Sequence, residues 1–143
     1  MNVVDHSSQP GTEWLDIVSR STLQEFSGAF SADPILEATV MAKPLLGVAA
    51  VYEFFRTTRS MYDRIHFVQE TRSIARIYLE WEGVFQGKEV SGVTVFTYDA
   101  QGTIERIRLF HYPYAQQSSF SAELVRRYLL KTQSINTPSR SAP

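Results

Sequence analysis

Histidine is the residue type in this chain that could transfer a proton near neutral pH. The sequence contains three histidines and no cysteine. His111 could take up and return a proton because the unperturbed pKa of an imidazole lies close to neutrality. His6 lies in a polar leader, and His66 has no second ligand nearby at metal-binding spacing, so we expect no metal site and no cofactor. Without cysteine, disulfides and thiolate catalysis are excluded within this chain.

His111 lies near the end of the segment from Ser73 to Tyr112. The residue pattern of this segment predicts three successive strands. Large apolar residues alternate there with polar or smaller ones at a period of two, which a helix cannot satisfy. The residues on one side of this alternation are Ile77, Leu79, Trp81, Thr94, Phe96, Tyr98, Ile107, Leu109 and His111. Gln86-Gly87 and Asp99 to Gly102 have turn composition, so neighbouring strands should pair antiparallel as a meander.

The remaining segments predict elements that wrap this sheet. We expect a flexible leader over residues 1–11, short helices over 12–18 and from Thr22 to about Ser31, a turn at Asp33-Pro34 and a strand over 35–41. A helix should follow Gly47 and end near residue 60, and a strand should cover 64–71. A final helix should begin near Ser121, and residues 132–143 are too polar to pack and should form a flexible tail. One domain, residues 12–131, results.

Composition limits the partners of this domain. The formal net charge is -1, from 14 basic and 15 acidic residues, which gives no electrostatic basis for binding nucleic acid or an anionic membrane. The first residues show neither a signal peptide nor a membrane span, so we expect a cytoplasmic protein. Aromatic residues make up 13% of the chain and must line a core or a cavity.

Two segments resemble the nuclear transport factor 2-like superfamily, which includes ketosteroid isomerase and the SnoaL-like polyketide cyclases. The segment from Lys43 to Phe55 is similar to the lead into the long helix of that superfamily, and Gly92 to Arg108 is similar to its last hairpin. The resemblance implies an α+β fold in which amino-terminal helices wrap a cone-shaped, bent antiparallel sheet, also described as a cystatin-like roll. The fold alone does not fix a function, because it hosts enzymes and binding domains alike.

The chain departs from ketosteroid isomerase at the positions that do its chemistry. Matching the two through Gly47 and Gly102 places the catalytic aspartate of the isomerase at Ala38, its oxyanion-hole aspartic acid at Thr94 and its tyrosine near Trp14. Alanine cannot accept a proton, and a threonine hydroxyl is a weaker donor than a neutral carboxylic acid. Steroid-type isomerisation is therefore not expected.

The resemblance also implies a pocket, because it places Thr94 on the inner face of the sheet. The expected ligand-binding residues are Trp14, Phe30, Phe55, Leu79, Trp81, Thr94, Phe96, Leu109 and His111. His111 and Thr94 are the candidate catalytic residues. The alternative is that His111 is a core-edge imidazole bonded to a backbone carbonyl, Tyr112 or Tyr114. Tyr52 and Tyr62 could point their hydroxyls into the cavity or to water.

The predicted outer face carries Glu80, Glu82, Arg106 and Arg108 among Val93, Val95 and Phe110. Such a face suits a sheet-to-sheet homodimer, and the alternative is a solvated face with ordinary ion pairs. We expect a domain that binds a small hydrophobic molecule. If the domain is an enzyme, we expect a cofactor-free isomerase or cyclase that uses His111 for proton transfer. The rival is a non-catalytic binding or interaction module. An epoxide hydrolase is a third option, but Arg106 and Arg108 should face outward.

Overall fold

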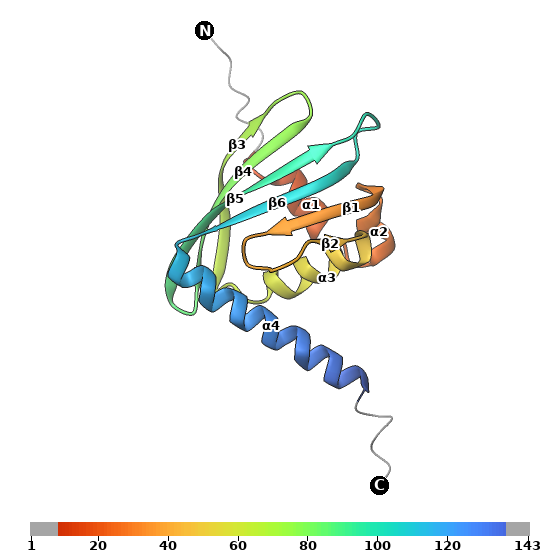
Figure 1. The fold of residues 1–143 in the computed structure, drawn as a ribbon. Coiled ribbons are helices and arrows are strands. Elements are labelled where there is room, and N and C mark those ends of the chain that lie inside the picture. The colour runs from red at the N-terminus through yellow and green to blue at the C-terminus, as the bar shows by residue number, and fades with distance from the viewer. Residues whose placement is uncertain (1–8, 137–143) are drawn as a thin grey trace.

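The computed structural model describes residues 9–136 and shows an α+β fold with one curved, six-stranded sheet (Figure 1). The strand order is β2-β1-β6-β5-β4-β3. The strands are β1 (Phe30–Ala38), β2 (Leu45–Leu46), β3 (Arg64–Arg72), β4 (Arg76–Phe85), β5 (Lys88–Tyr98) and β6 (Ile104–Tyr112), and the helices are α1 (Thr12–Val18), α2 (Leu23–Ser27), α3 (Val48–Arg59) and α4 (Tyr114–Asn136).

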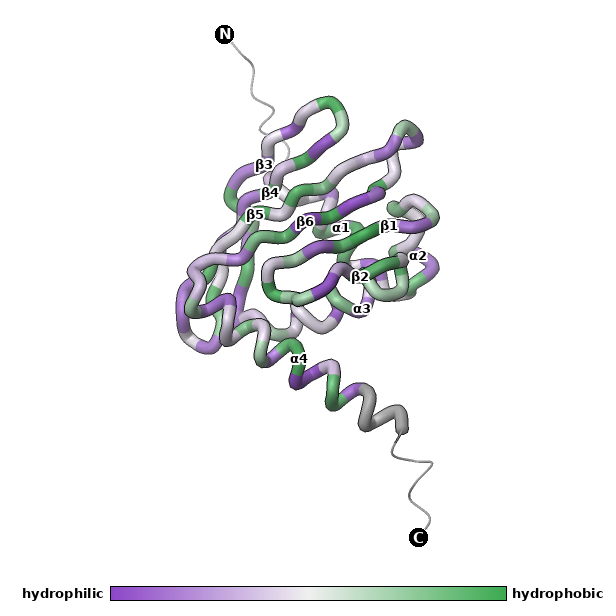
Figure 2. The backbone as a smooth tube through the Cα atoms, viewed as in Figure 1, coloured by the Kyte–Doolittle hydropathy of each residue, from purple (hydrophilic) through white to green (hydrophobic). Residues whose placement is uncertain are grey.

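The predicted meander is confirmed: β3, β4, β5 and β6 pair antiparallel in sequence order. The β4–β5 turn places Gln86 and Gly87 at positive φ, as a tight hairpin turn requires. In the β5–β6 turn the Asp99 carboxylate accepts hydrogen bonds from the backbone N–H groups of Gln101 and Thr103. Hydrophobic and hydrophilic residues alternate along these strands (Figure 2), which gives the sheet an inner and an outer face.

The predicted bounds of the first strand, residues 35–41, were wrong. β1 begins at Phe30 and pairs parallel to β6, so the sheet is mixed. Thr22 caps the second helix, with its hydroxyl accepting from the Glu25 N–H, but the helix ends at Ser27. The expected turn at Asp33-Pro34 lies inside β1, where a register shift between Phe30 and Ile35 accommodates a proline that cannot donate to the ladder.

The last helix is longer than predicted. It begins at Tyr114, directly after β6, and runs through Asn136, so it includes the first five residues of the expected tail. Its first turns pack against the end of the sheet, and its later part projects away from the rest of the fold (Figure 1). Most of the expected leader and the end of the expected tail, residues 1–8 and 137–143, lie outside the described residues.

The helices and the inner face enclose one hydrophobic core. α1, α2 and α3 cover one end of this face, and the first turns of α4 cover the other through Phe120 and Leu124. None of the described helices is both long and apolar enough to span a membrane.

Candidate functional site

The candidate site is a row of inner-face residues at the end of the sheet that α4 covers. Trp81 of β4 pairs with Gly92 of β5, which pairs with His111 of β6. Strand alternation therefore points all three into the core. The prediction that His111 faces inward agrees with its exposed fraction of only 6%.

Gly92 allows the indole and the imidazole to meet across the middle strand. A Cβ added at Gly92 would lie 2.3 Å from Cζ2 of Trp81 and 2.2 Å from the carbonyl oxygen of Phe110. The indole therefore occupies the space that a side chain at position 92 would fill, and its ring centroid lies 5.2 Å from that of His111. A glycine opposite a tryptophan is the sequence signal for this close approach.

His111 has one side-chain hydrogen bond and one orphaned nitrogen. Its Nε2 lies 3.2 Å from the Tyr62 hydroxyl, and its backbone N–H donates to the Thr39 hydroxyl at 3.0 Å. Its Nδ1 is buried and has no hydrogen-bond partner, alone among the buried side-chain polar atoms of the described residues. The side chain bonds neither a backbone carbonyl nor Tyr112 or Tyr114. Such an orphaned group typically costs about 1–3 kcal/mol.

Burial sets the protonation states of this pair. It lowers the pKa of His111 to about 4, because the apolar surroundings disfavour the imidazolium. It raises the pKa of Tyr62 well above its usual value for the same reason. At neutral pH the pair is therefore an uncharged imidazole beside an uncharged phenol. The Tyr62 hydroxyl can donate to Nε2 or accept from it, so Nδ1 is left respectively as a donor or as an acceptor.

Phe120 of α4 closes the site. Its ring centroid lies 4.7 Å from that of His111 and 4.9 Å from those of Tyr62 and Phe85, and its side chain is 1% exposed. Leu124, one turn later, is equally buried. The ring therefore occupies the space that a ligand beside His111 would take.

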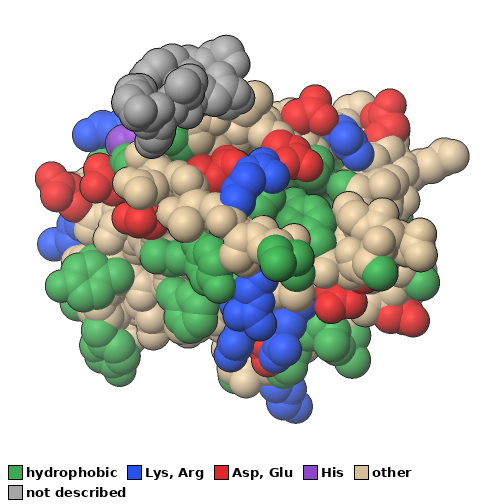
Figure 3. All heavy atoms as spheres, turned by 90° about the horizontal axis from the view of Figure 1, so that it is seen from above, with side chains coloured by type: hydrophobic (Ala, Val, Ile, Leu, Met, Phe, Trp, Pro, Cys, Tyr) green, Lys and Arg blue, Asp and Glu red, His purple; other side chains and the backbone are tan. Residues whose placement is uncertain are grey.

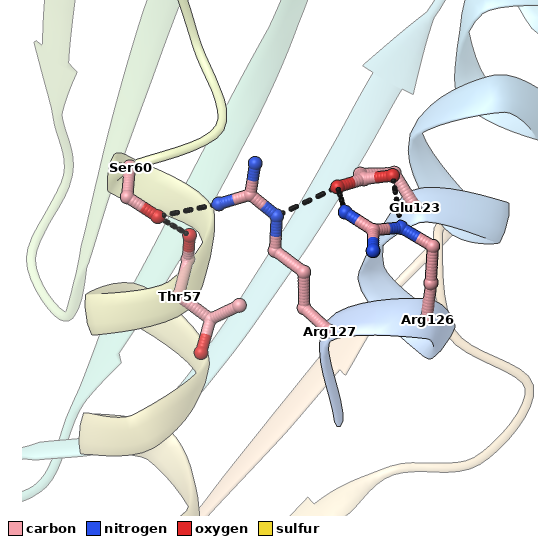
Figure 4. A network of polar contacts seen from close by, with 5 residues as sticks. All are labelled: Thr57, Ser60, Glu123, Arg126 and Arg127. Atoms are coloured by element: carbon pink, nitrogen blue, oxygen red, sulfur yellow. Dashed lines mark hydrogen bonds and ion pairs between the residues drawn. The ribbon is translucent and has the colours of Figure 1, made fainter. Parts of the chain in front are cut away.

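Exposed polar contacts hold α4 against α3 (Figure 4). The Arg127 guanidinium donates to the Ser60 hydroxyl at 2.9 Å and to Glu123 of its own helix at 2.8 Å, and Ser60 in turn donates to the Thr57 carbonyl. Lys131 extends the contact by donating to the Thr57 hydroxyl and pairing with Glu53. Ion pairs at such an exposed surface contribute little individually.

A second aromatic cluster lies at the opposite end of the inner face. The Trp14 ring packs on Phe55 at 4.9 Å and on Phe96 at 4.8 Å between centroids. The Arg72 guanidinium beside it binds the carboxylates of Glu13 and Glu70. The space left between these side chains is about 10 Å³, roughly the minimum for one water molecule.

The structure thus distributes the predicted site residues over the whole inner face. Trp81 and His111 meet at the α4 end, whereas Trp14, Phe55 and Phe96 meet at the other end, four strand residues or roughly 13 Å away. Leu79, Thr94 and Leu109 form the row next to that of Trp81 and His111, level with Ala38, and Phe30 packs on Phe26. All of the predicted residues are buried.

Sequence reasoning missed part of the site. It left the direction of Tyr62 open and assigned no role to Phe85 or Phe120. Phe120 lay just before the expected start of the last helix, so the aromatic residue in helical spacing with Leu124 was the available signal.

The outer face carries the charges that were predicted to point away from the core. Arg106 and Arg108 both bind the Glu37 carboxylate of β1, at 2.7 Å and 3.3 Å. Neither guanidinium reaches the inner face, so the Asp-Arg-Asp arrangement of an epoxide hydrolase is not assembled from them.

Comparison with known proteins identifies the fold. No protein-family model and no curated protein sequence matches the chain. Among solved structures, a steroid delta-isomerase from Pseudomonas aeruginosa is similar with a TM-score of 0.75 and 18% identity, over 84% of this chain and 89% of that one. An uncharacterised protein with a cystatin-like fold from Silicibacter pomeroyi gives a TM-score of 0.75 and 12% identity over 84% and 85%. A putative polyketide cyclase from Sinorhizobium meliloti gives 0.54 and 19% over 67% and 88%.

Proposed function

We propose that this chain, which has the nuclear transport factor 2-like fold, is a binding domain for a small, flat hydrophobic molecule that carries one polar group. The orphaned Nδ1 of His111 is the observation that carries the proposal. A ligand that supplied one hydrogen bond there would remove the penalty of an unpaired buried atom, while its apolar body would replace Phe120 against Trp81, Tyr62 and Phe85.

Access to this site requires movement of α4. The inner face is filled when Phe120 is in place, so a ligand enters only when the first turns of the helix lift. Opening must undock Phe120 and Leu124, break the hydrogen bond that the Ser121 hydroxyl donates to the Val40 carbonyl at 2.7 Å, and move Tyr128, which packs against the core. The Arg127 contact with Ser60 is exposed and adds little to this resistance.

Catalysis is the second candidate, and the His111–Tyr62 pair favours it. In that case His111 would accept a proton from the bound molecule, and the Tyr62 hydroxyl or Thr94 would stabilise the developing oxyanion. The low pKa of His111 makes the imidazole a weak base in the closed state, and opening to solvent would restore its basicity. Two similar structures are named as an isomerase and a putative cyclase, activities that move protons. Binding comes first because it needs only the observed orphaned nitrogen.

The test compares 2-naphthol with naphthalene, which has the same rings without the hydroxyl. Calorimetry measures affinity, and long-range ¹H–¹⁵N spectra of the imidazoles locate the contact. We expect 2-naphthol to shift the His111 Nδ1 resonance and to bind about 3- to 10-fold more weakly to His111→Phe, with naphthalene unaffected by the substitution. His66→Phe, on the exposed face of β3, is the matched control. Failure of both probes to bind, or equal losses for both, would overturn the proposal.

We also propose that the chain forms a homodimer through the outer face of the sheet. Phe110 and Tyr112 of β6 are 45% and 67% exposed on this face, and no described helix of the chain covers it. A large apolar patch rimmed by charge is typical of protein interfaces. Sedimentation velocity over a concentration series tests the dimer, and a monomer at every concentration would refute it.

A further inference from the structure

We propose that the cleft between α3 and α4 binds a phosphate group, and that the bound phosphate holds α4 in the closed position seen in the structure. The phosphate site depends only on the side chains of the cleft. Its effect on ligand entry rests on the binding function proposed above for the His111 site.

Basic and hydroxyl side chains from both helices line this cleft, which has a volume of about 520 Å³. The lining residues are Arg56, Thr57 and Ser60 of α3 and Arg126, Arg127, Leu130 and Lys131 of α4. The contacts that Arg127 and Lys131 make with Ser60 and Thr57 show that cationic groups of α4 reach the surface of α3. A single ligand in the cleft could therefore contact both helices.

Positive charge in the cleft exceeds the negative charge that pairs with it. Four of the lining side chains are cationic, and two carboxylates form ion pairs with them, which leaves an excess of two positive charges. Glu123 is shared by two arginines, and Glu53 pairs with Lys131. Arg56 has no ion pair among the described residues, since its guanidinium donates to the Tyr52 hydroxyl and lies over the Tyr52 ring.

This excess is local to the cleft. The whole chain has a formal net charge of -1, so the rest of the chain carries more acidic than basic groups. At the end of the molecule opposite α4, acidic and basic side chains are interspersed (Figure 3). An anion is therefore attracted to the α3–α4 cleft more than the net charge of the chain suggests.

The hydrogen-bond donors of the cleft are only partly used. Arg127 donates through Nε and Nη1, and Arg126 donates through Nε and Nη2. Nη2 of Arg127 and Nη1 of Arg126 therefore have no partner among the described residues (Figure 4). The Thr57 hydroxyl accepts from Lys131, and no described residue accepts its hydrogen. Guanidinium and hydroxyl donors are thus available to the oxygen atoms of a ligand.

A phosphate monoester matches this set of groups. Its dianion balances the excess of two positive charges, and guanidinium groups donate to phosphate oxygen atoms in a planar fork. Leu130 lines the cleft and is 49% exposed, so an apolar group attached to the phosphate has a surface to contact. The structure therefore favours a phosphorylated small molecule with an apolar part.

A phosphate that contacts both helices opposes the lifting of α4. Arg56 belongs to α3, whereas Arg126 and Arg127 belong to α4, so lifting separates the groups that share the phosphate. Charge-assisted hydrogen bonds to a shared dianion are stronger than the exposed contacts that cross the cleft without it. Because a ligand reaches His111 only when α4 lifts, bound phosphate should lower the affinity for that ligand, and the ligand should lower the affinity for phosphate by the same factor.

The test measures the binding of inorganic phosphate and of phenyl phosphate to the full chain by calorimetry at low ionic strength. Arg56→Gln should weaken both about 5- to 10-fold, because Arg56 supplies a charge that no carboxylate neutralises. Arg76→Gln removes the same charge from an exposed position of β4 and is the matched control. In a second arm, cosedimentation with phosphatidylcholine vesicles, with and without phosphatidic acid, distinguishes a lipid headgroup from a soluble phosphate monoester.

Binding in either arm that Arg56→Gln weakens and Arg76→Gln leaves unchanged would support the site. Equal losses in the two variants would show a non-specific effect of charge and overturn it, as would the absence of binding in both arms.

Hydrogen exchange tests the effect on α4 without a ligand at His111. Phenyl phosphate, at a concentration that saturates the wild-type chain, should slow the exchange of amides in residues 117–124 at least about 3-fold, and less in Arg56→Gln. The affinity for 2-naphthol should fall by a similar factor. If phosphate binds but leaves exchange in α4 unchanged, it does not hold the helix. A chain that binds phosphate and slows exchange but never binds 2-naphthol would refute the function proposed for His111 and support the phosphate site.

Discussion

Replacing Phe120 with alanine tests whether this ring closes the His111 site or only contributes to the hydrophobic core. The side chain is 1% exposed and contacts the rings of His111, Tyr62 and Phe85, so its removal loses the burial of a whole phenyl group. Removing a fully buried phenyl ring costs about 3–5 kcal/mol, and we expect about 3 kcal/mol here because α4 can shift to fill part of the space. Urea unfolding measures this loss.

The same change should open the site. Water that reaches His111 relieves the desolvation that lowers its pKa to about 4, so the pKa should rise toward its ordinary value of roughly 6.5. The affinity for 2-naphthol should increase by at least about 10-fold, because the ligand no longer has to displace a docked ring. An NMR pH titration and calorimetry give these two values.

Phe26→Ala is the matched control. Phe26 is equally buried but packs on Trp14, Phe30 and Tyr52, away from His111. It should lose comparable stability without gaining affinity for 2-naphthol or changing the pKa of His111. If Phe120→Ala loses stability but leaves both the affinity and the pKa unchanged, Phe120 does not close a binding site and the reasoning fails.

Three further predictions concern stability and exchange. The pKa of His111 is lowered in the folded chain, so the unfolded chain binds more protons between about pH 4 and pH 6.5. The free energy of unfolding should therefore fall by up to about 3 kcal/mol as the pH drops through this window. Denaturant titrations should show this part of the slope vanish in His111→Phe and persist in His66→Phe. Gly92→Ala should lower the free energy of unfolding by about 3 kcal/mol, because its Cβ would overlap the Trp81 indole and the Phe110 carbonyl oxygen. Gly28→Ala is the control: no atom lies closer than 3.5 Å to its added Cβ, so the free energy of unfolding should change by less than about 1 kcal/mol. Equal losses in the two variants would contradict the close approach at Gly92. Arg127→Ala should cost less than about 1 kcal/mol but speed 2-naphthol association up to about 5-fold in stopped-flow traces, and an unchanged rate would show that this contact does not restrain α4.

Local patterns predicted most of the sheet because they act over a few residues. The alternation from Ile77 to His111 fixed which side chains share a face, and the turns at Gly87 and Asp99 fixed the antiparallel pairing. The helix expected from Thr22 also begins there, with the Thr22 hydroxyl accepting from the Glu25 N–H. Each of these features depends on backbone geometry and near neighbours in the chain.

Predictions that depended on distant pairing were less accurate. β1 was expected to start after Pro34, but pairing of Phe30 with Ile104 extends the strand across the proline. The last helix was expected to start at Ser121, but docking of Phe120 on Phe85 and Tyr62 favours helix from Tyr114 onward. Burial against a partner far along the chain outweighed the local signals in both cases.

The sequence by itself determined the strands of the meander and which side chains share a face, because a period of two leaves no other arrangement for that segment. The family resemblance supplied the expectation that the face of Thr94 and His111 is the inner one. Only the tertiary structure decided what His111 meets. The Tyr62 hydroxyl comes from a loop and the Phe120 ring from a helix, and packing brings both to the imidazole while leaving its Nδ1 without a partner. Periodicity specifies which face a side chain joins, whereas its neighbours on that face, and the space between them, follow from how distant segments pack.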